Sequence, residues 1–151
     1  MRPSDVQQYS VERGHAPALE VSAVVSEQTA IVHVAGELDL ATAPELEKIL
    51  HGLERECVRI VLDLSHLAFI DSTGLRLAVI EHQRAMVDGF EFAIAGATGP
   101  VLDVLRLTGL DIALPMAPDV ASIVDSRAAG RRAQRRDGRA ADVKAVTPGR
   151  G

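Results

Sequence analysis

Two short stretches hold the residues best suited to chemistry: the GELD segment at 36–39 and the DSTGL segment at 71–75. In the second, Ser72 places a hydroxyl group where a helical pattern begins. The first turn of a helix has unpaired N–H groups and a partial positive charge. A phosphate group attached there would meet hydrogen-bond donors, so we expect the fold to tolerate phosphorylation of Ser72.

Helix capping is a simpler explanation of the same residues. Asp and Ser are preferred N-cap residues because their side-chain oxygens accept hydrogen bonds from N–H groups of the first turn. Either Asp71 or Ser72 can act in this way. The spacing alone therefore leaves a structural cap and a modification site both open.

The strands around these segments are predicted from the spacing of apolar residues. Alternation over 19–25 and the apolar run 29–35 predict a β-hairpin, with its first strand at an edge of the sheet. The nearly continuous apolar run 58–64 predicts a strand buried on both faces. It leads through a short loop to DSTGL. Residues 90–94 and 112–114 predict two further strands.

Helices alternate with these strands. Thr42 and Glu45 have capping-box spacing, Pro44 lies in the first turn, and apolar residues follow with helical period to Leu53. Three more helices are predicted, from Ser72 to near Gly89, over 100–108 and over 119–124. The apolar face of the helix that begins at Ser72 contains Leu75, Ala78, Val79 and Met86. The order implies an α/β fold with an open mixed, mostly parallel β-sheet packed with helices.

Composition and charge restrict the class of protein. The chain of 151 residues is 47% hydrophobic and only 3% aromatic, which suits one domain with an aliphatic core. Residues 1–125 hold 8 Lys and Arg against 19 Asp and Glu, a net charge of −11, which argues against direct nucleic-acid binding. A single cysteine, Cys57, and the lack of a long apolar run predict a cytoplasmic protein with no membrane association.

The ends of the chain differ from its centre. Residues 1–17 show no period and predict a flexible N-terminal arm, while 18–125 form the predicted domain. Residues 126–151 hold 8 basic and 2 acidic residues and no aromatic, Leu or Ile residue. Such a segment cannot bury enough surface to offset its chain entropy, so we predict a disordered basic tail.

Other groups of residues are weaker candidates for a catalytic, cofactor or metal site. The GATGP turn at 96–100 lacks the third glycine of a dinucleotide motif, and Asp63, Ser65 and His66 lack the G-x-S-x-G frame of a hydrolase. The five histidines have no metal-ligand spacing. We therefore expect neither catalysis nor a cofactor or metal, and we expect Cys57 to be a buried filler.

The GELD segment and the run RIVLDLSHLAFIDSTGL at 59–75 together resemble the STAS family of anti-sigma factor antagonists. The resemblance covers about Leu19 to Val124, and the DSTGL element after a VLDL strand is its most specific part. It implies a STAS-like fold whose regulatory serine is phosphorylated by a partner. Carried onto this sequence, that serine is Ser72, and the neighbouring partner-binding residues are Glu37, Asp39, Asp71, Thr73, Gly74 and Leu75.

The resemblance also implies the partners. The unphosphorylated protein would bind an anti-sigma factor that is a serine kinase of histidine-kinase-like fold, and so release a sigma factor. A serine/threonine phosphatase of the metal-dependent class would reset it, and a weak homodimer fits the family. The alternative is a scaffold subunit of a stress-sensing complex, which would run as a large oligomer on a sizing column.

Overall fold

A single sheet organises the fold. In the computed structural model, which describes residues 5–13 and 16–126, six strands pair in the order β1-β2-β3-β4-β5-β6. The strands are β1 (Asp5–Arg13), β2 (Ala16–Ser26), β3 (Thr29–Leu38), β4 (Arg59–Ile70), β5 (Glu91–Ala95) and β6 (Met116–Ala117). The first three pair antiparallel, and β3 to β6 run parallel. This open mixed sheet confirms the predicted fold class.

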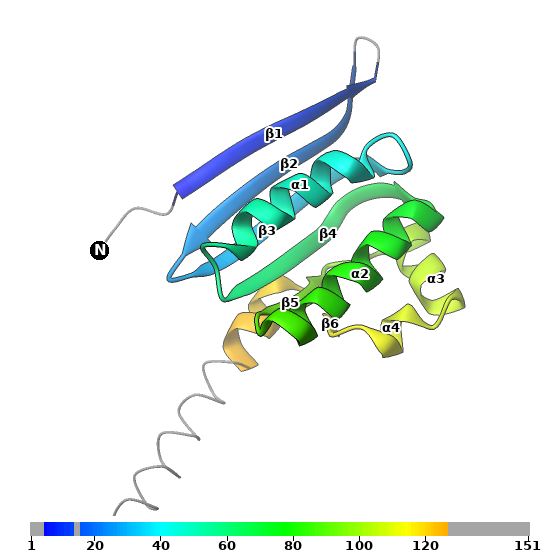
Figure 1. Cartoon of the computed structure of the whole chain (residues 1–151). Helices are drawn as coiled ribbons and strands as arrows, with labels where there is room; N and C mark the ends of the chain where they lie inside the picture. The colour runs from blue at the N-terminus through cyan, green and yellow to red at the C-terminus, as the bar shows by residue number, and fades with distance from the viewer. Residues whose placement is uncertain (1–4, 14–15, 127–151) are drawn as a thin grey trace, which may run out of the picture. The chain divides into compact units, whose positions relative to one another are not determined.

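The two long helices cover one face of the sheet. Helices α1 (Ala43–Glu54) and α2 (Ser72–Asp88) lie side by side across it (Figure 1). The shorter α3 (Gly99–Leu107) and α4 (Leu110–Ala113) follow β5, and residues 120–126 are also helical. Gly89 ends α2 as predicted, in the left-handed conformation at a φ of 83°.

The core between sheet and helices is aliphatic. Leu46 and Leu50 of α1 are fully buried, and Ile60, Val61 and Leu62 are buried in succession along β4. Consecutive residues of a strand point to opposite faces, so β4 is buried on both faces, as the sequence predicts. This strand carries the chain directly to Asp71.

The N-terminal segment differs from the prediction. The sequence predicts a flexible arm over 1–17, yet Asp5–Arg13 forms β1, which pairs with β2 and takes the edge position expected for the hairpin. Residues 6–10 are exposed. Backbone pairing therefore holds most of this strand, and only Val11 among residues 6–11 is partly buried against the core. Such a strand shows no apolar alternation that a sequence pattern could detect.

Three other boundaries also differ. Residues 110–113 form α4, so the strand predicted over 112–114 is wrong, and the last strand is β6 at 116–117. Short apolar runs do not distinguish a strand from a helix. β3 extends to Leu38, so most of GELD lies in a strand, and β4 extends to Ile70, so the loop predicted before DSTGL is absent.

The buried face of α2 is also not the predicted one. Met86 is 73% exposed, and the buried residues are Gly74, Leu77, Ala78, Glu81 and Ala85. Their spacing is helical, but one of them is a glutamate, which an apolar pattern excludes. The sequence prediction therefore missed Glu81.

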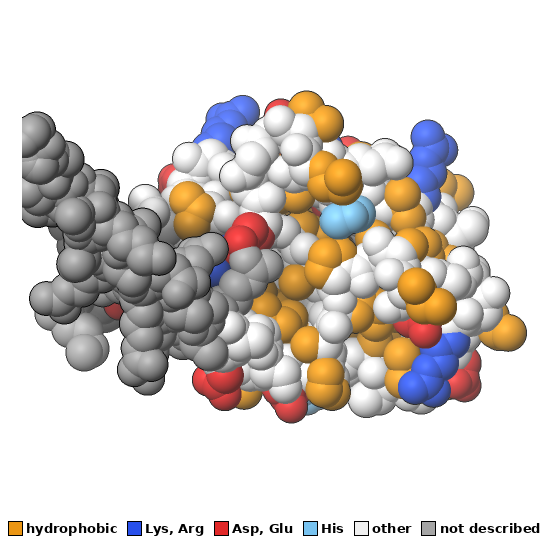
Figure 2. All heavy atoms as spheres, turned by 90° about the horizontal axis from the view of Figure 1, so that it is seen from below, with side chains coloured by type: hydrophobic (Ala, Val, Ile, Leu, Met, Phe, Trp, Pro, Cys, Tyr) orange, Lys and Arg blue, Asp and Glu red, His pale blue; other side chains and the backbone are white. Residues whose placement is uncertain are grey.

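Hydrophobic side chains on the face in Figure 2 are spread among polar ones, with Lys and Arg side chains at its edges. Among the described helices, none has the length and apolar character needed to cross a membrane. The predicted tail lies, from residue 127 onward, outside the described residues.

Candidate functional site

The GELD and DSTGL segments meet at the carboxyl ends of β3 and β4. These strands are parallel neighbours, and Leu38 is in register with Ile70. Asp71 N donates to Leu38 O at 3.1 Å, and Leu40 N donates to the Asp71 Oδ2 atom at 3.3 Å. The two segments that the sequence singled out therefore form one surface, joined through Asp71.

Asp71 is the cap of α2. Its Oδ1 atom accepts hydrogen bonds from Thr73 N at 2.8 Å and Gly74 N at 3.2 Å. Ser72 is the first residue of the helix, and its side chain is exposed. The cap is therefore Asp71, and Ser72 presents its hydroxyl group to solvent.

This cap changes the expectation that a phosphate would meet waiting donors. Two N–H groups of the first turn are already satisfied by Asp71, and Leu75 N donates to Asp71 O at 3.0 Å. A phosphate on Ser72 would instead lie beside the Asp71 carboxylate. The local electrostatics at Ser72 are therefore set by a fixed negative charge as well as by the helix dipole.

Asp39 organises the turn that leads into α1. Its Oδ1 atom accepts hydrogen bonds from Ala41 N at 3.0 Å and Thr42 N at 3.2 Å. The Thr42 hydroxyl donates to Glu37 O at 2.8 Å and makes no cap to α1, so the predicted capping box with Glu45 does not form. Asp39 instead stabilises the turn that precedes α1, and Thr42 remains the N-cap position without a side-chain hydrogen bond to the helix.

The other predicted site residues differ in exposure. Glu37 is exposed, Thr73 and Leu75 are half-buried, and Gly74 is buried. A Cβ atom on Gly74 would lie 2.7 Å from a side-chain atom of Ile70 and 2.9 Å from one of Leu38. Gly74 thus allows α2 to pack closely on the ends of β3 and β4.

Two exposed apolar side chains border this surface and were not predicted. Leu40 is 73% exposed and follows GELD, while Phe69 is 49% exposed and lies in register with Glu37. Apolar residues are usually assigned to the interior, so the sequence offered no signal for them. Both residues add exposed apolar area next to the acidic GELD segment.

Among the described residues, Asp63, Ser65 and His66 do not form a catalytic triad. Asp63 pairs through Oδ2 with His33 Nδ1 at 2.6 Å, whereas His66 Nδ1 lies 3.0 Å from the Ser65 hydroxyl. Burial alone would raise the pKa of Asp63, but hydrogen bonds from Ser65 and His33 hold that pKa below its usual value. Asp63 therefore orients His33 on the neighbouring strand.

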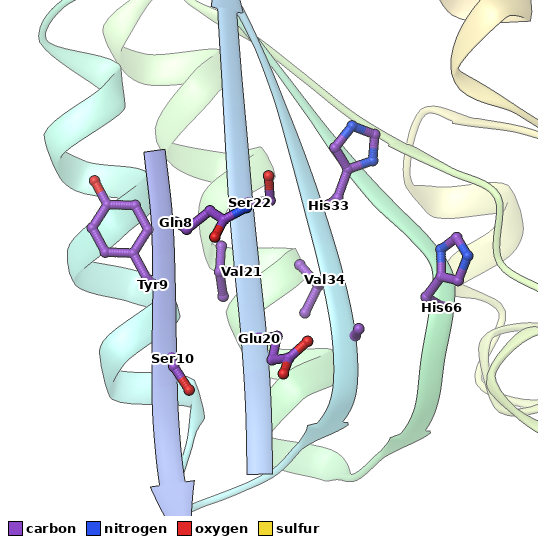
Figure 3. A pocket seen from close by; sticks show the side chains of 10 residues that line it. Gln8, Tyr9, Ser10, Glu20, Val21, Ser22, His33, Val34 and His66 are labelled. Carbon is purple, nitrogen blue, oxygen red and sulfur yellow. The ribbon is translucent and has the colours of Figure 1, made fainter. Parts of the chain in front are cut away.

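Two remaining features, Cys57 and a groove on the sheet, lie outside the Ser72 surface. Cys57 is buried, and burial, with a contribution from the Glu56 charge, raises the pKa of its thiol, in keeping with an unreactive filler. A shallow groove of about 350 Å³ crosses the sheet face opposite α1 and α2 (Figure 3). Its polar lining includes Gln8, Ser10, Glu20, Ser22, His33 and His66.

Comparison with known proteins identifies the family. The model of the STAS domain matches residues 20–123, which leaves β1 outside the match. An anti-sigma-B factor antagonist of Staphylococcus aureus (strain NCTC 8325 / PS 47) is 35% identical over 80 residues, 52% of this chain and 74% of the relative. An anti-sigma F factor antagonist of Paenibacillus polymyxa is 32% identical over 88 residues, 57% of this chain and 75% of that protein. The chain belongs to the STAS domain family.

Solved structures agree with this result. The crystal structure of an anti-sigma factor antagonist from Mycobacterium paratuberculosis has a TM-score of 0.65 and 26% identity, and the match covers 72% of this chain and 92% of that one. The structure of the antagonist SpoIIAA in its unphosphorylated form matches with a TM-score of 0.61 and 18% identity, over 72% of this chain and 96% of that one. At this identity the match supports the fold alone. Within the family, the chain groups with the anti-sigma factor antagonists.

Proposed function

We propose that this protein is an anti-sigma factor antagonist controlled by phosphorylation of Ser72. Unphosphorylated, it binds an anti-sigma factor that is also a serine kinase, and so releases a sigma factor. Phosphorylated, it dissociates. The observation that carries the proposal is the exposed Ser72 at the first residue of α2, on a surface shared with GELD.

The switch acts by charge. A phosphate adds roughly −1.5 to −2 charges at neutral pH, beside the Asp71 carboxylate and close to the segment that holds Glu37 and Asp39. Like charges about 4 Å apart cost on the order of 4 kcal/mol at an effective dielectric constant of 20. A partner that places a carboxylate here would lose about a thousandfold in affinity, at roughly 1.4 kcal/mol per tenfold.

The fold survives the modification. The positive end of α2 favours a negative charge at its first residue by about 0.3–1 kcal/mol, and the first-turn hydrogen bonds to Asp71 need not break. The remaining surface residues, Thr73 and Leu75, contribute contacts around Ser72. Exposed Leu40 and Phe69 supply apolar area that a partner would bury.

The protein itself performs no catalysis in this scheme. ATP and magnesium are bound by the kinase, and a serine/threonine phosphatase restores the binding form. We assign the switch to the cytoplasm, without membrane or nucleic-acid binding, on the basis of the lone cysteine and the acidic folded part.

The experiment compares Ser72→Ala, Ser72→Asp and the matched control Ser65→Ala, an exposed serine on β4. A pull-down with Ser72→Ala identifies the anti-sigma factor, and calorimetry then measures its affinity for each form. We expect Ser72→Ala to bind constitutively, Ser72→Asp and the phosphorylated protein to bind weakly, and Ser65→Ala to behave as wild type. Phosphopeptide mapping should place one phosphate on Ser72.

Two results would contradict the proposal in different ways. Equal affinity of the phosphorylated and unphosphorylated forms would remove the switch. Loss of binding together with an unfolded amide NMR spectrum would replace the charge mechanism with a folding switch.

A further inference from the structure

Helices α1 and α2 enclose a cluster of polar side chains that the Ser72 surface does not use. Glu81 of α2 is 0% exposed, and its Oε1 atom lies 3.2 Å from His51 Nε2 of α1. Glu54 of α1 completes the group. Each of the three residues offers one possible metal-ligand atom, and these atoms all lie within 4.8 Å of one another. Since an α-helix rises about 1.5 Å per residue, Glu81 lies on the order of 13 Å along α2 from Ser72.

One atom of this cluster lacks a partner. Among the described residues, nothing hydrogen-bonds to Glu81 Oε2, although the atom is fully buried. A buried polar atom without a partner costs about 1–3 kcal/mol. The Glu81 carboxyl group thus has one unsatisfied oxygen, within a cluster that also holds an imidazole nitrogen and a second carboxyl group, and a bound cation would satisfy it.

We propose that His51, Glu54 and Glu81 bind a divalent transition-metal ion, with Zn²⁺ as the best fit, between α1 and α2. Imidazole nitrogen and carboxylate oxygens are ligands that Zn²⁺ uses in three-residue sites. With metal–ligand bonds of about 2.0–2.1 Å, tetrahedral ligands lie roughly 3.3 Å apart. The contact between His51 and Glu81 already has this length, and side-chain rotation of Glu54 closes the remainder.

The surroundings fit a metal site. Arg84 donates hydrogen bonds to Glu54 at 2.6 Å and 3.4 Å and would hold that carboxylate in position for the ion. Glu47 lies 3.7 Å from His51 Nε2. With Glu81 ionised in the bound state, three carboxylates face one guanidinium group, a charge that a divalent cation neutralises.

An ion can reach this site from solvent, and it would stabilise the packing of α1 against α2. The side chains of His51 and Glu47 are 33% and 46% exposed, so the cluster opens to solvent along α1. A bound ion would link α1 to α2 and stabilise the folded state by mass action. No spacing in the sequence indicates the site, because the ligands lie on two helices and meet only in the folded protein.

Titration of the metal-free protein with ZnCl₂ tests the proposal, with calorimetry and thermal unfolding as readouts. We expect one ion per chain and a higher melting temperature, reversed by EDTA. Glu81→Gln keeps the shape of the side chain but removes the carboxylate, and it should lower the affinity for Zn²⁺ by about tenfold or more. His66→Gln, which alters an exposed histidine outside the cluster, is the matched control and should bind as wild type.

His51→Gln provides a second variant at a half-exposed position, where folding is not at risk. It too should weaken Zn²⁺ binding. Absence of binding to the wild-type protein would overturn the proposal. So would binding that both cluster variants leave unchanged, which would assign the ion to the other histidines.

Discussion

Raising the pH from 6 to 8 should destabilise the metal-free protein through Glu81. Burial, with the neighbouring Glu54 adding to it, raises the pKa of the Glu81 carboxyl from 4.5 to about 8. The groups that face it are Glu54, Arg84, Glu47 and His51. The folded state therefore retains a proton that the unfolded chain has already lost.

The sign and size of the effect follow from linkage. Because the folded state binds more protons between pH 4.5 and about 8, stability is greatest below pH 4.5 for this group and falls as the pH rises through 8. At roughly 1.4 kcal/mol per pH unit, less the flattening near the folded pKa, the loss from pH 6 to 8 is about 2 kcal/mol. Glu54 acts in the opposite direction at lower pH. Burial raises the pKa of Glu54, but its hydrogen bonds with Arg84 and Glu81 and the nearby positive charges together lower that pKa below its usual value.

Urea unfolding with EDTA present, at pH 6, 7 and 8, measures the loss. With a slope of about 1–3 kcal/mol per M, the midpoint should fall by about 1 M. Glu81→Gln is neutral at every pH and should remove most of this dependence, whereas Glu45→Gln, a change on the outer face of α1, should retain it. A pH dependence that is the same in Glu81→Gln and wild type would refute the assignment to Glu81.

Three further predictions concern other parts of the structure. Gly74→Ala forces a methyl group against side chains of β3 and β4 and should cost about 1–3 kcal/mol in urea unfolding. Gly52→Ala in α1, where no atom lies within 4 Å of the new methyl group, should instead stabilise by roughly 0.5–1 kcal/mol; destabilisation of both variants alike would contradict the packing argument. Asp71→Ala removes the cap of α2 and should cost about 1 kcal/mol, so unchanged thermal stability would deny its capping role. Calorimetry should detect no NAD or nucleoside triphosphate binding at the GATG turn, and micromolar binding lost in Gly99→Val would disprove this.

Local patterns were enough to predict much of the fold. The hairpin of β2 and β3, the buried strand β4 and the start of α2 at Ser72 all depend on the period of neighbouring residues, on capping types or on a glycine stop. The same local information gave the two segments of the site, because the carboxyl ends of adjacent parallel strands meet at one edge. The DSTGL motif then identified which serine to consider.

Contacts between distant residues decided the rest. Capping rules left open whether Asp71 or Ser72 caps α2, and the structure assigns the cap to Asp71. The second oxygen of Asp71 accepts a hydrogen bond from Leu40 N, 31 residues away, which no spacing rule could predict. β1 is held by backbone pairing that leaves no apolar pattern. Glu81 is buried only because α1 covers it with His51 and Glu54, and a charged residue on a helix is otherwise expected at the surface. Helix periodicity fixes which residues share a face, but only packing determines what that face meets, and with it the charge and pKa of the groups between the helices.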